Sequence, residues 1–174
     1  LAEMTMGQSP SSELYNEDGE GWPFHQGVAD FGERFVTHRI YTTAENRIAE
    51  PGDILCSVRA PVGRLNLTTD KIVIGRGLAA IRSRFDQQSF MFYQLNVHFF
   101  KEDLIGAGAI FASVSKKELF AQEMLTPPDR LIALFEETSG PIDDQLRVLR
   151  LENNRLCAAR ELLLPRLMSR EIAV

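Results

Sequence analysis

The densest apolar pattern of the chain lies between Gly52 and Arg84 (GDILCSVRAPVGRLNLTTDKIVIGRGLAAIRSR). Three runs rich in Val, Ile and Leu, at 54–58, 62–67 and 71–81, are bounded by Gly, Pro and Asp residues, a pattern typical of short strands joined by turns. We therefore predict a three-stranded arrangement, with the third strand interrupted by Gly75-Arg76-Gly77.

Five arginines stand at the predicted turns and strand ends of this stretch: Arg59, Arg64, Arg76, Arg82 and Arg84. Guanidinium groups held on a rigid sheet are suited to contacting an anionic surface that is rich in hydrogen-bonding groups. The alternative is an ordinary sheet with solubilising surface charge. For Arg76, which lies between two glycines, a second alternative is a structural arginine that bonds across its own loop.

The flanking segments carry weaker patterns. The composition of Met4–Phe24, rich in Gly, Ser, Pro and acidic residues, favours a long ordered loop. The aromatic-rich run Gln87–Lys101 lacks Gly and Pro, and we predict a buried helix there in preference to a base-stacking platform. Ser115 followed by Glu118 matches a helix capping box, and this lysine-containing loop could also approach a phosphate backbone.

From Asp129 onward a heptad pattern predicts a long helix that pairs with another helix. Pro127 and Pro128 precede it, Gly140-Pro141 should kink or break it, and Pro165 should end it. The heptad pattern forms an apolar stripe along the helix. On a lone helix this stripe would remain exposed to solvent, so a partner helix is implied. The alternative is packing on its own domain. The predicted pairing residues are Ile132, Phe135, Ile142, Leu146, Leu149, Asn153, Leu156 and Leu163.

The 174 residues, 44% hydrophobic and 25% charged, are typical of a globular protein with one well-buried core. No apolar run is long enough for a membrane span, and the start lacks a signal-peptide pattern. Cys56 and Cys157 lie far apart, which predicts reduced structural thiols in a cytoplasmic protein. The three histidines show no metal-binding spacing, so no metal or cofactor is expected.

The net charge of −5 is unevenly distributed along the chain. Residues 1–33 contain seven acidic and no basic residues, whereas residues 34–84 contain nine Lys or Arg against four acidic residues. A basic middle within an acidic protein can form a local electrostatic footprint for nucleic acid. We find no nucleophile–His set, paired carboxylates or phosphate-binding loop that would indicate an enzyme.

Three separated stretches resemble one family, the specificity subunits of type I restriction-modification enzymes. The stretch MGQSPSSELYN with GWPFHQGVADFG is similar to the start of a target-recognition domain. GDILCSVRAPVGRLNL with IGRGLAAIR is similar to the central block, and ENNRLCAARELLLPRLMSREI resembles the closing region. The resemblance covers nearly the whole chain in the family's order.

The resemblance implies an α+β fold: a mixed globular target-recognition domain at 1–126 with a small twisted sheet, then a long coiled-coil-type helix within a spacer and dimerisation region at 127–174. Such subunits catalyse nothing. They read split targets in double-stranded DNA and dock methyltransferase subunits, and through these the restriction subunit. This chain holds one domain-plus-helix unit, which suggests the C-terminal half or a naturally short half-subunit, so bipartite recognition would require two copies paired through the helix.

Our candidate DNA contacts are polar and basic residues of the predicted sheet and its loops, which could neutralise phosphates or touch base edges. Two alternatives from other classes remain: a helix-mediated protein-assembly module that lacks DNA affinity, and the target-recognition part of a fused methyltransferase-nuclease. The candidates are Gln8, Ser9, Arg34, Arg39, Arg59, Arg64, Arg76, Lys116 and Lys117.

Overall fold

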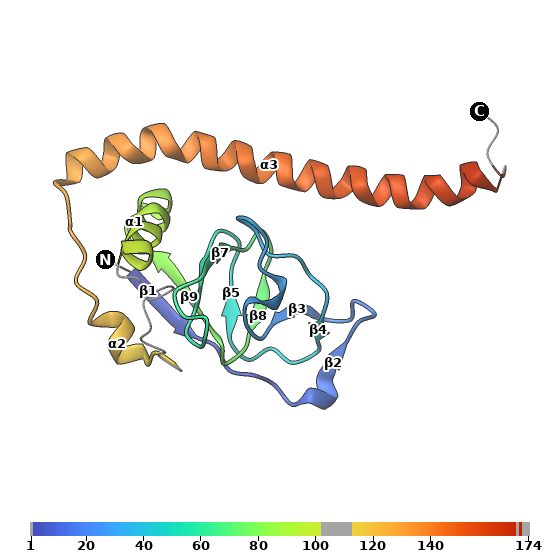
Figure 1. Cartoon of the computed structure of the whole chain (residues 1–174), viewed down its shortest axis with the longest axis horizontal. Coiled ribbons are helices and arrows are strands. Elements are labelled where there is room, and N and C mark those ends of the chain that lie inside the picture. Colours follow the sequence, from blue (N-terminus) through green and yellow to red (C-terminus); the bar gives the residue numbers. More distant parts are fainter. Residues whose placement is uncertain (1, 102–112, 170, 172–174) are drawn as a thin grey trace. The chain divides into compact units, whose positions relative to one another are not determined.

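The computed structural model describes residues 2–101, 113–169 and 171, and it has the predicted α+β architecture (Figure 1). The chain divides into two compact units, residues 1–136 and 137–174. The first unit holds two sheets and two helices, and the second holds most of a third, long helix. Among the described residues, none of the helices combines the length and apolar character needed to cross a membrane.

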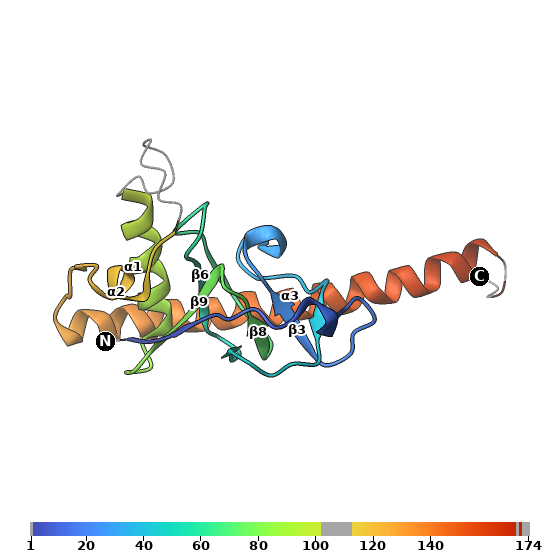
Figure 2. The ribbon, with the colours of Figure 1, turned by 90° about the horizontal axis from the view of Figure 1, so that it is seen from below.

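The first sheet is antiparallel throughout, with strand order β1-β9-β6-β7. Its strands are β1 (Ala2–Met6), β9 (Leu78–Ser83), β6 (Ile54–Ser57) and β7 (Leu65–Leu67). Strands β6 and β9 run side by side at its centre (Figure 2). The predicted strands at 54–58 and 62–67 thus correspond to β6 and to the shorter β7.

The second sheet has the strand order β2-β4-β3-β8-β5, and β3 and β8 are its parallel pair. The short 3-10 helix η1 (Ser12–Leu14) lies in the connection from β1 of the first sheet to β2, and a second one, η2 (Val28–Asp30), lies between β3 and β4. The strands are β2 (Tyr15–Asn16), β4 (Tyr41–Thr42), β3 (Trp22–His25), β8 (Ile72–Ile74) and β5 (Ile48–Ala49).

Two predictions about these sheets are wrong. The stretch Met4–Phe24 is not one loop, because it contributes the end of β1, all of β2 and part of β3. Residues 71–81 do not form one interrupted strand either, since β8 and β9 belong to different sheets. All three residues of β8 and the first four residues of β9 are buried, so this part of the sequence has no polar alternation that would reveal the change of sheet.

The first sheet lies between two apolar clusters, which explains its continuous hydrophobic runs. Ile54 and Cys56 of β6 face a cluster that includes Met91, Leu95 and other residues of α1 (Gln88–Lys101). Leu55, between them in sequence, points to the opposite cluster, which contains residues of β5 and β8. Alternate residues of a strand face opposite sides, so α1 and the second sheet cover the two faces of the first sheet. The predicted helix at 87–101 is confirmed.

The capping box that we predicted at Ser115 is confirmed. Helix α2 (Lys116–Phe120) begins after Ser115, whose Oγ accepts from the Glu118 N–H at 3.3 Å. The Glu118 carboxylate in turn accepts from the Ser115 N–H at 2.7 Å. Interactions of this carboxylate with the Ser115 side chain and with the Ser115 N–H lower the pKa of Glu118. The adjoining glycine-rich residues 106–108 lie outside the described part of the chain.

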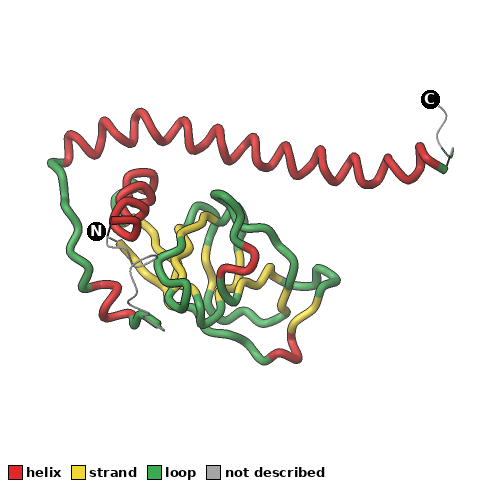
Figure 3. The backbone as a smooth tube through the Cα atoms, viewed as in Figure 1, coloured by secondary structure: helices red, strands yellow, loops and turns green. Residues whose placement is uncertain are grey.

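Helix α3 (Asp129–Met168) is continuous over 40 residues, so a break at Gly140-Pro141 and an end at Pro165 are both wrong predictions. Figure 3 shows it as a single helical tube. Pro141 does not break the helix, and Pro165 does not end it. A proline removes a single intrahelical hydrogen bond, and the adjoining turns can keep the helix intact when the freed carbonyl faces solvent. Pro141 is exposed.

Candidate nucleic-acid interface

Most of the candidate residues gather at one end of the first sheet. Strand β1 ends at Met6, β6 ends at Ser57 and β9 begins at Leu78, and the register pairs Met6 with Ala79 and Ser57 with Leu78. Because the strands alternate in direction, the loops that follow β1 and β6 and the loop that precedes β9 emerge together. We call residues 7–9, 25–27, 58–64 and 75–77 the loop edge.

The loop edge is basic in composition. Its loops contain Arg59, Arg64 and Arg76 and no acidic residue. All three arginines are exposed, and their guanidinium groups form no ion pair with the residues that the structure describes. Charged groups without an internal partner stay available for an external anion, so this edge has the electrostatic character of a phosphate-binding surface.

Backbone hydrogen bonds join the loops of the loop edge to one another. The Val58 N–H donates to the Gly77 carbonyl at 2.9 Å, which joins the Arg59 loop to the Arg76 loop. The Val114 N–H donates to the Val58 carbonyl at 2.8 Å. The second bond brings the segment that leads into Lys116 and Lys117 to the same end of the sheet. Both lysines are exposed, and Lys116 Nζ lies 5.5 Å from the centroid of the Phe120 ring.

Close backbone packing joins the loops of Gly7, Gln26 and Gly75. A Cβ on Gly7 would lie 2.1 Å from the Gly75 carbonyl oxygen, and one on Gly77 would lie 2.4 Å from the Gln26 carbonyl oxygen. These distances are far below van der Waals contact, so only glycine fits at either position without a shift of the backbone. The glycines around Arg76 therefore let three chain segments approach one another closely.

Hydrogen bonds complete this junction. The Gly75 N–H donates to the His25 carbonyl at 2.8 Å, and the Gly77 N–H donates to the Gln26 carbonyl at 3.0 Å. The Gln8 N–H donates to the Ile74 carbonyl at 2.9 Å. The Arg76 N–H donates to Ser9 Oγ at 3.2 Å. The Arg76 backbone is fixed, whereas its side chain is exposed and has no hydrogen bond with a described residue.

Two candidate arginines lie in a different setting. The guanidinium of Arg34 lies 4.6 Å from the ring centroid of Phe92 and 5.3 Å from that of Tyr93, and it donates to the Tyr93 hydroxyl at 3.2 Å. Arg39 forms an ion pair with Asp30 at 3.1 Å. Both side chains are engaged within the domain, and no main-chain hydrogen bond joins either residue to the loop edge.

A polar chain of two histidines and an aspartate begins at His25 of the loop edge, and sequence reasoning missed it. His25 Nε2 is 3.0 Å from His38 Nδ1, and His38 Nε2 is 3.0 Å from Asp70 Oδ2. Asp70 also accepts from the Thr69 hydroxyl at 2.7 Å. The spacing of these residues along the sequence gives no local signal, because 45 residues separate His25 from Asp70.

The environment keeps His25 neutral at physiological pH. Burial, followed by repulsion from His38, lowers the pKa of His25 to about 4. The hydrogen bonds fit a tautomer in which His38 donates to Asp70 and accepts from His25 Nε2. Hydrogen bonds from His38 and Thr69 outweigh the opposite effect of burial and lower the pKa of Asp70. Since the His25 carbonyl accepts from Gly75, this chain anchors the base of the loop edge.

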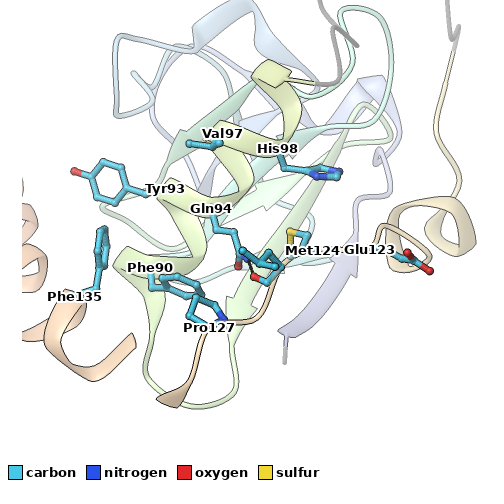
Figure 4. Close-up of a pocket in the computed structure, with 10 residues that line it drawn as sticks. Phe90, Tyr93, Gln94, Val97, His98, Glu123, Met124, Pro127 and Phe135 are labelled. Atoms are coloured by element: carbon cyan, nitrogen blue, oxygen red, sulfur yellow. Dashed lines mark hydrogen bonds between the residues drawn. The ribbon is translucent and has the colours of Figure 1, made fainter. Parts of the chain in front are cut away.

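The first unit also contains an apolar cavity of about 400 Å³ away from the loop edge (Figure 4). Residues of α1, the segment that leads to α3 and the first turns of α3 line it, among them Phe90, Tyr93, Pro127 and Phe135. The Phe135 ring packs edge-on against the rings of Phe90 and Tyr93, at 5.9 and 5.7 Å. This aromatic lining lacks the cationic groups that a polyanion would need.

The predicted pairing residues of α3 fall into two groups. Ile132 is buried in the first unit, and Phe135 packs on α1 as described. The residues farther along the helix are exposed, and their exposed fractions reach 69% at Leu156. These exposed residues are Ile142, Leu146, Leu149, Asn153, Leu156 and Leu163.

The part of the chain that the structure describes contains no group of three or more His, Cys, Asp or Glu side chains that could hold a metal ion. Cys56 and Cys157 are both free thiols. Burial raises the pKa of the Cys56 thiol to about 12, so it stays protonated and suits a packing role.

Comparison with known proteins gives one consistent family. The chain is 37% identical over 171 residues to the putative type I restriction enzyme MjaX specificity subunit of Methanocaldococcus jannaschii. The match covers 97% of this chain and 40% of that protein, so the chain spans less than half of this relative's length. No family model matches the chain.

Solved structures agree with this match. The HsdS subunit from Thermoanaerobacter tengcongensis is 37% identical, with a TM-score of 0.68 over 87% of this chain and 37% of that one. A chain from a study of complex assembly and conformational transition in the type I R-M system is 35% identical, with a TM-score of 0.65 over 95% of this chain and 43% of that one. The type I restriction-modification S subunit from M. genitalium, 17% identical with a TM-score of 0.67 over 97% of this chain and 44% of that one, shares the fold.

Proposed function

We propose that this chain, a homologue of the specificity subunits of type I restriction-modification systems, is a non-catalytic unit that reads one half of a split target in double-stranded DNA. The observation that carries the proposal is the loop edge, where Gln8, Ser9, Arg59, Arg64 and Arg76 emerge together from one end of a sheet. We assign residues 1–126 to target recognition and 127–174 to the helical spacer.

The side chains of the loop edge would have two roles, contacts with phosphates and contacts with base edges. Exposed arginines without an internal partner would neutralise phosphates and add affinity that depends on salt. Amide, hydroxyl and guanidinium groups on backbone fixed by the glycine junction would contact base edges. The engaged settings of Arg34 and Arg39 make these two the weaker DNA candidates of the original set. The net charge of −5 implies that useful affinity arises in a complex with other subunits.

The long helix supports the second half of the proposal, which concerns assembly. We propose that the exposed row of Ile142, Leu146, Leu149, Leu156 and Leu163 on α3 packs against a second long helix, either of another copy or of another part of a longer chain. Methyltransferase subunits would dock around this helical spacer and carry out the chemistry, and the restriction subunit would join through them.

Charge along α3 favours an antiparallel pair if two copies associate. Residues 129–144 contain five acidic residues and one basic residue, whereas residues 145–168 contain five basic and two acidic residues. In a parallel pair like charges would face one another, and in an antiparallel pair the acidic half would face the basic half. An antiparallel pair would also present two recognition domains to the two halves of one DNA target.

The test is selection from a random duplex library by the complex of this chain with its methyltransferase subunits, followed by sequencing of the bound DNA. We expect one defined half-site to be enriched when this chain is present. When the chain is left out, we expect no half-site to be enriched. An assembly module, the competing interpretation supported by the exposed helix row, would still join the complex while the bound DNA showed no sequence that depends on this chain.

A further inference from the structure

The side chain of Gln26 holds a position at the loop edge that its place in the sequence did not indicate. Gln26 follows β3 directly and is exposed. The Gly75-Arg76-Gly77 loop encloses its backbone: a Cβ on Gly75 would lie 2.9 Å from Gln26 Cα, and the Gln26 carbonyl accepts from the Gly77 N–H. Gln26 and Arg76 therefore extend from two segments of backbone that lie directly against each other.

Hydrogen bonds give the Gln26 amide a defined orientation. The Arg76 N–H donates to Ser9 Oγ at 3.2 Å, and the Ser9 hydroxyl donates to Gln26 Oε1 at 3.2 Å. The hydroxyl has one proton, and Oε1 is the acceptor that it can reach. The Gln26 amide oxygen is thus turned toward Ser9. The amide nitrogen keeps both of its donor hydrogens, and the oxygen keeps one lone pair.

We propose that Gln26 is a specificity-determining residue that reads one base pair of the target through its amide, with adenine as the matching base, and that Ser9 is its positioning residue. A glutamine amide fits adenine because its nitrogen donates to N7 while its oxygen accepts from N6. Ser9 uses one lone pair of the amide oxygen and leaves the other for N6. This inference rests on the proposed function, since it assigns a role within the same DNA-reading surface.

The geometry also separates Gln26 from the phosphate-binding residues. A neutral amide releases no counterion from DNA when it binds, so replacement of Gln26 should not alter the salt dependence of binding. Adjacent Arg76 carries the charge and can contact a phosphate or a guanine from the neighbouring backbone. The loss of Gln26 should therefore affect one position of the target, and the loss of a phosphate contact should affect all sequences alike.

The experiment measures binding of the complex between the full chain and its methyltransferase subunits to a panel of duplexes. The panel contains the selected target and every single base-pair substitution of its half-site. For Gln26→Ala we expect discrimination to fall at one A·T position by about 5- to 150-fold, with binding to the duplexes already substituted there unchanged. The slope of binding against salt concentration should stay as in the wild type.

Ser9→Ala and Gln87→Ala complete the design. Ser9→Ala should weaken discrimination at the same position as Gln26→Ala, and Ser9→Thr, which keeps the hydroxyl, should restore it. Gln87 follows β9 at the opposite end of the sheet, so Gln87→Ala is a matched control that should leave the whole panel unchanged.

The outcomes distinguish this inference from the proposed function. If the wild-type complex discriminates among the duplexes and Gln26→Ala keeps every preference, or loses binding equally on all of them, the role of Gln26 is wrong and DNA reading stands. If Ser9→Ala affects a position other than that of Gln26→Ala, the positioning role of Ser9 is wrong. If the wild-type complex shows no preference at all, the proposed function itself fails.

Discussion

The guanidinium of Arg82 donates two hydrogen bonds to the carboxylate of Asp53, from Nε to Oδ1 at 2.6 Å and from Nη2 to Oδ2 at 3.0 Å. Asp53 also accepts from the Glu50 N–H at 2.9 Å, and its side chain is only 6% exposed. This pair ties the turn before β6 to strand β9. It differs from the exposed arginines of the loop edge, although all of them lie in the same stretch of sequence.

Replacement of Arg82 by alanine should lower the free energy of unfolding by about 2 kcal/mol, because it leaves a buried carboxylate without its main partner. The estimate is below the value for a fully buried pair, since Arg82 itself is half-exposed. Urea unfolding measures it. Arg84→Ala removes an exposed pair with Glu3 at 3.5 Å and should cost at most about 0.5 kcal/mol. Equal effects of the two variants would contradict this assignment.

Replacement of Arg59 or Arg64 by glutamine should weaken binding of the complex to all DNA sequences by a similar factor. Each variant should also reduce the slope of log K against log salt by roughly 1, because one phosphate contact and its released counterion are lost. Titrations at several salt concentrations measure this slope. Arg39→Gln removes a cation already paired with Asp30 and should change the slope less. An unchanged slope for both loop-edge variants would remove them from the interface.

Replacement of Gly77 by alanine should disrupt the junction below Arg76, because the new Cβ would meet the Gln26 carbonyl oxygen at 2.4 Å. We expect a loss of about 1–3 kcal/mol in the free energy of unfolding. Gly27 offers a matched control two residues from His25: a Cβ there has open space, and its backbone is extended. Gly27→Ala should be nearly neutral in the same unfolding measurement. A neutral Gly77→Ala would show that the close approach is dispensable.

Stability should fall as the pH is lowered through the window set by His25. The unfolded chain binds a proton on His25 with a pKa near 6.5, and in the folded domain this pKa is about 4. Between these values the unfolded state holds more protons, so the stabilisation is complete above pH 6.5 and is lost as the pH falls toward 4. The loss amounts to about 3 kcal/mol across the window.

Urea unfolding of the wild type and of His25→Gln at a series of pH values measures this dependence. The variant lacks the titrating ring, so its free energy of unfolding should vary less between pH 6.5 and 4. Parallel curves for the two proteins would mean that His25 is not the group responsible. The lowered pKa of Asp70 acts in a separate window below its ordinary value, where acid protonates its carboxylate.

Replacement of Leu149 by lysine should weaken helix pairing and leave the first unit folded, because Leu149 lies in the exposed apolar row of α3. Val148 is exposed to a comparable degree but lies outside that row, so Val148→Lys is the control. Analytical ultracentrifugation of the chain compares their association. A wild-type chain that stays monomeric at high concentration would exclude pairing of copies and leave a helix in another part of a longer chain as the partner.

Local signals predicted local structure well in this chain. The capping box at Ser115 fixes the start of α2 through two bonds between residues three apart, and the apolar load of Gln87–Lys101 identified a buried helix. A break of the helix was one of the two outcomes predicted for Gly140-Pro141, and it does not occur because the loss of one hydrogen bond at Pro141 leaves the helix intact on both sides. Residues 71–81 were misjudged because burial on both faces erases the period of the strands.

The candidate site shows the same limit. Gln8, Ser9 and Arg76 were selected from residue type and from flanking glycines, and strand register brings them together. Gln26 was missed because its role depends on contacts across 17 and about 50 residues, with Ser9 and with the glycines around Arg76. The small residues at positions 7, 75 and 77 were the one available signal, and only a structure reveals which backbones they bring into contact.

The central claim is that this chain determines which DNA sequence is recognised, and mapping of methylated bases across a genome tests it most directly. The comparison is between cells that carry the methyltransferase gene with the gene for this chain and cells that carry the methyltransferase gene alone. We predict one methylated motif that is present only with this chain and whose A·T position relaxes in Gln26→Ala. A methylation pattern that is the same with and without the chain would contradict the account.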